Sequence, residues 1–187
     1  MKQLALDIGL ASGPTLSRFF AGPNEAALQH LRLWAGEGSQ PDTRSPVPTY
    51  LWGEAGSGKT HLLKAVRQAL SDQGASVGWL DASVASAAEF DERWAAVVLD
   101  DVHLYSTAQQ AMAFNWFVNA ISPANGAPRW VLAAGNLPPA DLPLRDDLRS
   151  RLGWGHVFQL QLLGEAERRA VLRQEADARG VFLGDEV

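Results

Sequence analysis

The sequence predicts an α/β fold in which a five-stranded parallel sheet lies between helices. Two observations predict it. Five apolar runs alternate with amphipathic, helix-like stretches along the 187 residues, which is the pattern of a parallel sheet covered on both faces. A glycine-rich segment, residues 53–60, also stands between one apolar run and an amphipathic stretch, the strand–loop–helix order of this fold class. Such sheets have right-handed crossovers and carry ligands at the carboxyl ends of their strands.

The individual elements follow from apolar periodicity and from capping and breaking residues. Asn24 is expected to cap a first helix that ends near residue 34, and Gly180 is expected to stop the last helix. Residues 36–48, rich in Gly, Pro, Ser and Thr, are expected to form a loop. The expected strands are 49–53, 76–81, 95–100, 130–134 and 156–161, and the other expected helices are 58–70, 107–121 and 165–179.

The composition is that of a chain able to bury the core of one domain, since 47% of the residues are hydrophobic and 20% are charged. The absence of cysteine excludes disulfides, thiolate metal sites and cysteine nucleophiles. A net charge of −5 argues against strong autonomous binding to nucleic acid. Asp7 interrupts the N-terminal apolar stretch, and no apolar run is long enough to cross a bilayer. We therefore expect a cytoplasmic protein with no membrane partner.

The glycine-rich segment matches the pattern G-x-x-x-x-G-K-[ST], which predicts that it binds the phosphates of a nucleotide. Its glycines let the backbone curl so that successive N–H groups point into one concavity, at the positive start of a helix. Lys59 is expected to neutralise β- and γ-phosphate oxygens, and Thr60 to offer its hydroxyl to Mg²⁺. The predicted nucleotide-binding residues are Gly53, Glu54, Ala55, Gly56, Ser57, Gly58, Lys59 and Thr60.

Two adjacent carboxylates, Asp100 and Asp101, end the third apolar run. The carboxyl end of a buried strand beside a phosphate loop is where a nucleoside triphosphatase holds Mg²⁺ and its attacking water. Asp100 is expected to hold the metal together with Thr60, and Asp101 to polarise the water. The alternative is a strand followed by an Asp-rich turn, and the upstream loop favours the catalytic interpretation.

Asn136 follows the fourth apolar run, inside the segment Gly-Asn-Leu-Pro-Pro. An asparagine at a strand end can hydrogen-bond both a γ-phosphate and the attacking water, and so report whether that phosphate is present. A plain turn before two prolines explains the same residues, and position alone does not decide between the two.

Arg149 and Arg151 belong to the segment Arg-Ser-Arg-Leu-Gly-Trp-Gly. An arginine at a domain edge can reach the γ-phosphate held by a neighbouring subunit, where its planar fork stabilises the charge of the transition state. The alternative is an arginine that neutralises its own helix dipole or pairs with Asp146 or Asp147. Trp154, in the same segment, can border a partner surface.

The order of these four motifs resembles the AAA+ ATPases of the DnaA clade, whose initiator carries Ser-Arg-Phe-Gly-Trp-Gly where this chain has Ser-Arg-Leu-Gly-Trp-Gly. Residues 15–24 also resemble that clade's Phe-x-x-Phe-x-x-Gly-x-Asn element, which packs near the adenine. The resemblance implies a P-loop AAA+ core followed by a helical lid. It adds Phe20 and Gly22 to the expected nucleotide contacts, and His61, which follows the loop, is counted with them although a structural role is the alternative.

The N-terminus resembles the Gln-Leu-x-Leu-x-Leu peptide with which a DnaA-related regulatory inactivator binds the sliding clamp of DNA polymerase III. Such a peptide places Gln3 in a polar notch and inserts Leu4, Leu6 and Ile8 into an apolar groove. The alternative is a fraying N-terminal strand. The expected division of the chain is a tail, 1–14, an AAA+ core, 15–163, and the start of a truncated helical lid, 164–187.

The resemblance implies a negative regulator of replication initiation, tethered to the clamp, that stimulates hydrolysis of the ATP bound to DnaA. Arg151 is then the finger that acts in trans, with Arg149 in reserve, while the chain's own ADP or ATP, with Mg²⁺, fixes its geometry and its own ATPase activity is weak. No arginine of the lid can be assigned as a second sensor. The alternatives are a DnaA-like initiator fragment or helicase loader acting on DNA, also as a homo-oligomer, and an adaptor whose nucleotide is only structural.

Overall fold

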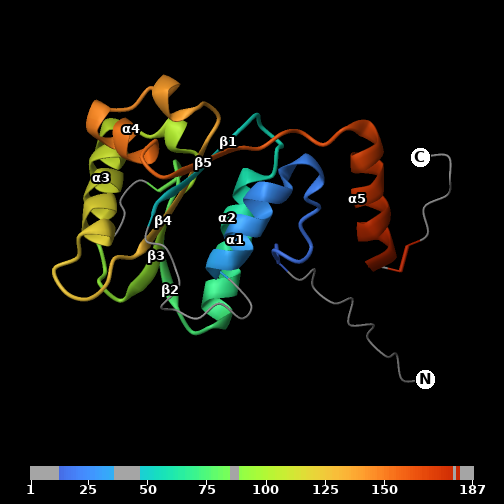
Figure 1. Cartoon of the computed structure of the whole chain (residues 1–187), viewed down its shortest axis with the longest axis horizontal. Helices are drawn as coiled ribbons and strands as arrows, with labels where there is room; N and C mark the ends of the chain where they lie inside the picture. Colours follow the sequence, from blue (N-terminus) through green and yellow to red (C-terminus); the bar gives the residue numbers. More distant parts are fainter. Residues whose placement is uncertain (1–12, 36–46, 85–88, 179, 182–187) are drawn as a thin grey trace, which may run out of the picture.

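A parallel sheet of five strands forms the centre of the protein, in the order β2-β3-β4-β1-β5. The computed structural model describes residues 13–35, 47–84, 89–178 and 180–181. This arrangement (Figure 1) confirms the expected α/β fold and its five strands. The strands are β1 (Thr49–Trp52), β2 (Ser76–Leu80), β3 (Trp94–Leu99), β4 (Trp130–Gly135) and β5 (His156–Gln159).

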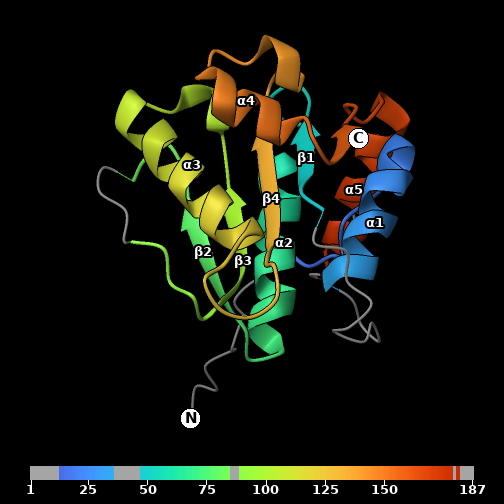
Figure 2. The ribbon, with the colours of Figure 1, turned by 60° about the vertical axis from the view of Figure 1, so that its left-hand side comes forward.

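Helices cover both faces of the sheet. Figures 1 and 2 show α1 and α2 on one face and α3 and α4 on the other, with α5 standing apart on the side of α1 and α2. Within the described residues, no helix is long and apolar enough to span a membrane. The α-helices are α1 (Glu25–Ala35), α2 (Lys59–Asp72), α3 (Thr107–Ile121), α4 (Asp146–Leu152) and α5 (Glu165–Ala178), and the 3-10 turns are η1 (Gly22–Asn24), η3 (Val102–Leu104) and η4 (Pro139–Asp141).

The core lies on both sides of the three interior strands, β3, β4 and β1, because neighbouring residues of a strand point to opposite faces. Val98 of β3 packs into the cluster under α1 and α2, whereas Val97 packs into the cluster under α3 and α4. On the α1 side, the ring of Trp34 stacks on Trp130 of β4 with a centroid distance of 3.6 Å. The two-sided burial explains why these strands read as continuous apolar runs.

One local expectation was wrong, and one helix was not predicted. Asn24 does not cap α1; its side chain exchanges two hydrogen bonds with the backbone of Gln161, accepting from the N–H at 2.8 Å and donating to the carbonyl at 3.0 Å. Helix α4 was not expected, because seven residues are too few to show helical periodicity. Helix α3 has the expected bounds and begins with a capping box between Ser106 and Gln109.

Several sequence expectations fall outside the described residues. The clamp-binding peptide is one, with Gln3, Leu4, Leu6 and Ile8, and most of the expected 36–48 loop is another. The last helix, α5, ends at Ala178, and the expected stop residue, Gly180, has φ 68° and donates its N–H to the carbonyl of Asp177 at 3.0 Å.

Candidate functional site

The glycine-rich loop connects β1 to α2 in a curled conformation. Gly56 and Gly58 have φ of 85° and 96°, a left-handed region that costs other residues conformational energy. Gly53 is required for a different reason, because a Cβ atom there would collide with the carbonyl oxygen of Leu160. Gly58 is also the N-cap of α2. The loop therefore ends at the positive start of a 14-residue helix, as phosphate binding requires.

Lys59 folds back onto the loop that precedes it. Its Nζ atom donates to the carbonyl oxygens of Gly53 and Glu54 at 2.7 and 2.9 Å and lies 3.5 Å from Oγ of Ser57. The residue is only 6% exposed. Burial lowers the pKa of Lys59, and the nearby Asp101 and Asp100 oppose that shift. The ammonium group is thus buried at the loop and satisfied by neutral acceptors.

Asp100 lies at the end of β3 and is brought next to the start of α2. Its side chain is hydrogen-bonded to Thr60, and its Oδ1 accepts the backbone N–H of Asp101 at 3.0 Å. Asp100 is 3% exposed, and this burial raises the pKa of its carboxyl. Asp101 has φ 49°, an uncommon conformation for a residue other than glycine that turns the chain sharply after the strand.

The residues present fit a Mg²⁺ ion that is held jointly with a nucleotide. Thr60 and Asp100 supply two adjacent oxygen donors. In the described part of the chain, no group of three or more His, Asp or Glu side chains could hold a metal by itself. Mg²⁺ is commonly bound by one or two protein oxygens together with phosphates and water, so this pair is a suitable partial site.

Asn136 lies beside the loop, directly after β4. The N–H of Gly53 donates to the carbonyl of Gly135 at 3.3 Å, which joins the start of the loop to the residue before Asn136. The next residue is fixed by Tyr50, whose hydroxyl donates to the carbonyl of Leu137 at 2.7 Å. The Asn136 side chain is exposed and so remains accessible to a ligand at this edge.

The phenylalanine ring that contacts the loop is that of Phe19. Its neighbour, Phe20, is the residue expected from the sequence near the nucleotide. A Cβ atom on Gly58 would come within 2.7 Å of the Phe19 ring, and the centroid of that ring is 5.5 Å from the centroid of the His61 imidazole. Gly22 instead borders α5, with 2.9 Å between its Cβ position and both Leu163 and Glu167. The sequence offered two adjacent phenylalanines, and nothing in it indicated which would face the loop.

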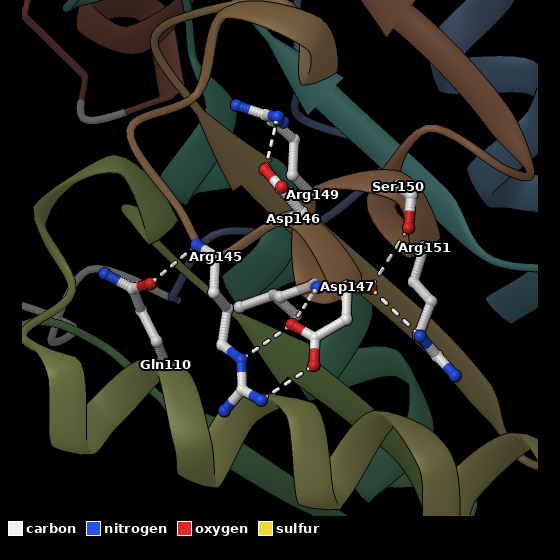
Figure 3. A network of polar contacts seen from close by, with 8 residues as sticks. Gln110, Arg145, Asp146, Asp147, Arg149, Ser150 and Arg151 are labelled. Atoms are coloured by element: carbon white, nitrogen blue, oxygen red, sulfur yellow. Dashed lines mark hydrogen bonds and ion pairs between the residues drawn. The ribbon is translucent and has the colours of Figure 1, made fainter.

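Arg149 and Arg151 both lie on α4 but have different partners (Figure 3). Arg149 forms an ion pair with Asp146 at 2.5 Å, which is the structural alternative considered above. Arg151 donates to the main-chain carbonyl of Asp147 at 3.0 Å, and its guanidinium carbon is 4.7 Å from the ring centroid of Phe114. Beside it is a hollow of about 280 Å³, lined by Phe117, Val118, Ile121, Ser122, Arg151 and Trp154.

No family model matches the sequence. The fold resembles domain III of the replication initiation protein DnaA from Thermotoga maritima, with a TM-score of 0.73, 21% identity, and coverage of 100% of this chain and 80% of that one. AMPPCP-bound DnaA from Aquifex aeolicus gives a TM-score of 0.68 at 20% identity, with coverage of 100% and 60%. A RuvB mutant from Thermotoga maritima gives 0.63 at 18%, with coverage of 92% and 56%.

The chain thus spans a little over half the length of the longer DnaA and RuvB structures that it resembles. Identities near 20% establish the fold, whereas the activities of those proteins do not follow from them. The protein has the AAA+ P-loop fold, as found in domain III of DnaA.

Proposed function

We propose that this protein binds ADP or ATP with Mg²⁺ at residues 53–60. The curled loop, the buried ammonium of Lys59 and the Thr60–Asp100 pair support the proposal, as does the fold shared with AMPPCP-bound DnaA. Lys59 exchanges its carbonyl acceptors for phosphate oxygens, and the loop N–H groups bind the same phosphates. The metal, when bound, neutralises phosphate charge. Asp101 orients water.

Further contacts complete this proposed site. Asn136 contacts the γ-phosphate from the end of β4, and Phe19 and Phe20, with Gly22 and His61, border the base. Helix α5 is the first helix of a lid over the nucleotide, because its first turn contacts Gly22. A buried carboxylate with a raised pKa close to a second acid is typical of functional sites.

The second part of the proposal is that Arg151 acts on the nucleotide of a neighbouring AAA+ subunit. One observation carries it: among the described residues of α4, Arg151 is the arginine that forms no ion pair with a carboxylate. It lies with α3 and α4, on the sheet face opposite α2, and beside Trp154, whose side chain is 66% exposed. An unneutralised guanidinium next to an exposed aromatic residue suits a docking surface.

The partner we propose is ATP-bound DnaA, and the role is that of Hda, the DnaA-related regulatory inactivator. Residues 3–8 tether the cytoplasmic protein to the sliding clamp, where it stimulates hydrolysis in DnaA and so prevents re-initiation. This tether rests on the sequence resemblance, since Gln3, Leu4, Leu6 and Ile8 lie outside the described residues.

The experiment measures phosphate released from ATP-loaded DnaA in the presence of clamp loaded on DNA. We expect Arg151→Ala to lower the stimulated rate by about 10³-fold while nucleotide and clamp binding by this protein stay unchanged. Arg149→Ala, on the same helix, is the matched control and is expected to retain the stimulation, because Arg149 is already paired with Asp146. Full stimulation by the Arg151→Ala protein would overturn the assignment.

Removal of residues 1–8 tests the tether separately. We expect this deletion to abolish clamp binding and clamp-dependent stimulation without affecting nucleotide binding. Binding to single-stranded DNA by the intact protein, unchanged by the deletion and by Arg151→Ala, would favour a DNA-acting initiator fragment or helicase loader instead.

A further inference from the structure

Helix α4 and its N-cap carry five charged residues, and the structure distributes their partners unequally. Arg145 donates two parallel hydrogen bonds to the carboxylate of Asp147, from Nε to Oδ1 at 2.6 Å and from Nη2 to Oδ2 at 2.7 Å. Arg149 pairs with Asp146. Arg151 donates a hydrogen bond to the main-chain carbonyl of Asp147 and pairs with neither acid (Figure 3). Two acids are therefore shared among three arginines, and Arg151 is the one left without a carboxylate in the part of the chain that the structure describes.

This distribution is not the one that helix spacing favours. Asp147 and Arg151 are four residues apart, which is the spacing at which an acid and a base on one helix form an ion pair. The Asp147 carboxylate is already occupied, by the fork of Arg145 and by the backbone N–H of Leu148 at 2.8 Å. Since this fork is bidentate, it competes well against a single new contact from Arg151.

Phe114 of α3 holds the guanidinium of Arg151 without neutralising it. The guanidinium carbons of Arg151 and Arg145 lie 4.7 and 4.9 Å from the centroid of this one ring. An aromatic ring attracts a guanidinium through its quadrupole and fixes its plane, but contributes no negative charge. Phe114 is half-buried between the helices, so it forms a fixed platform.

We propose that Arg145 and Phe114 are positioning residues for Arg151: Arg145 keeps the Asp147 carboxylate from pairing with Arg151, and Phe114 holds the guanidinium ready for the phosphate of a partner's nucleotide. This inference rests on the proposed function in trans. Neither residue itself needs to touch the partner. Removal of Arg145 frees Asp147 to pair with Arg151, and the finger then has to break an ion pair before it can act.

The decisive experiment is a suppression test in the DnaA phosphate-release assay, with the concentration of this protein varied. We expect Arg145→Gln to lower the maximal stimulated rate about two- to fivefold, the competition expected of one intrahelical ion pair, with half-saturation unchanged. The double variant Arg145→Gln/Asp147→Asn is expected to restore the rate, because an amide cannot neutralise Arg151. Asp147→Asn alone is expected to match the wild type.

Two substitutions test whether the role of Phe114 requires its aromatic ring. We expect Phe114→Leu to lower the maximal rate by a similar factor and Phe114→Tyr, which keeps the ring, to retain it. Arg93→Gln is the matched control, since Arg93 and Asp91 form the same two-residue, forked, exposed ion pair at the start of β3; we expect no effect.

The outcomes separate this inference from the function on which it rests. If Arg151→Ala loses stimulation while Arg145→Gln keeps all of it, the positioning role is wrong and the finger stands. If the double variant is as impaired as Arg145→Gln, Arg145 acts by another route and the inference is also wrong. If Arg151→Ala itself is fully active, the proposed function fails first.

Discussion

Charged residues gather both at the phosphate loop, which follows the carboxyl end of β1, and on helix α4, but the two regions compensate their charges differently. Around the loop, Lys59 and Asp100 are almost completely buried. Lys59 donates to the backbone carbonyls of residues 53 and 54, and Asp100 is hydrogen-bonded to Thr60 and to the next backbone N–H. On α4, the ion pairs of Arg145 and Arg149 are exposed to solvent. Figures 1 and 2 show α2, the helix that follows the loop, and α4 on opposite faces of the sheet.

This difference predicts different responses to substitution. A buried charge loses its hydration and must be compensated by fixed neighbours, so a change at the loop affects both folding and ligand binding. An exposed ion pair contributes little to stability. Changes on α4 should therefore alter interaction with a partner while leaving the fold intact.

Among the changes that affect nucleotide binding or folding, the largest effect should come from Lys59→Ala. The phosphates lose a charged donor that the loop holds in place, and we expect nucleotide affinity to fall by at least about 100-fold, measured by calorimetry with ADP and ATP. Lys64→Ala, an exposed lysine on the same helix, is the control and should bind normally. Retained affinity in the Lys59→Ala protein would contradict the loop assignment.

A second test concerns His30 of α1, which lies at the starts of β1 and β5. Its Nε2 is 2.8 Å from Oγ1 of Thr49, and its ring centroid is 4.5 Å from that of His156. Burial, together with His156, lowers the pKa of His30 from 6.5 to about 4. As pH falls through this window, the unfolded chain takes up the proton before the folded one does, so stability is lost with acidification.

We expect this one group to account for about 2 kcal/mol of the unfolding free energy lost between pH 6.5 and pH 4. Urea unfolding at several pH values measures the slope, and His30→Gln should reduce it. His61 and His103, whose pKa values burial also lowers, leave a residual slope. An unchanged slope in the variant would show that His30 is not the titrating group.

The sequence predicted well what depends on continuous patterns. In the sequence, β3 and β4 are continuous apolar runs because both of their faces are buried. The phosphate loop is recognised by closely spaced glycines followed by a lysine. Prediction failed where partners lie far apart along the chain: Asn24 bonds Gln161 rather than capping a helix. The choice between Phe19 and Phe20 and the pairing within α4 were not predicted for a second reason: several arrangements satisfy the local rules, and packing against other elements selects one.

Asp100→Asn should have a smaller effect. It should raise the stability of the fold but weaken the binding of nucleotide with Mg²⁺. Because burial raises the pKa of Asp100, its ionised form at neutral pH costs folding free energy. The isosteric amide still accepts the N–H of Asp101, so we expect the nucleotide-free variant to be more stable than the wild type in urea unfolding at neutral pH. Its Mg²⁺-dependent gain in nucleotide affinity should disappear. A variant that is less stable than the wild type would show that the carboxylate is well compensated.

The smallest effect should come from Arg149→Gln. This change breaks an ion pair in which Asp146 is 91% exposed, and such pairs contribute well under 1 kcal/mol. We expect the unfolding free energy to change by less than about 0.5 kcal/mol, with unaltered nucleotide affinity, in the same urea and calorimetric measurements. A larger loss would mean that the surface ion pairs of α4 stabilise the fold. Substitutions on α4 could then no longer be assumed to affect partner binding alone.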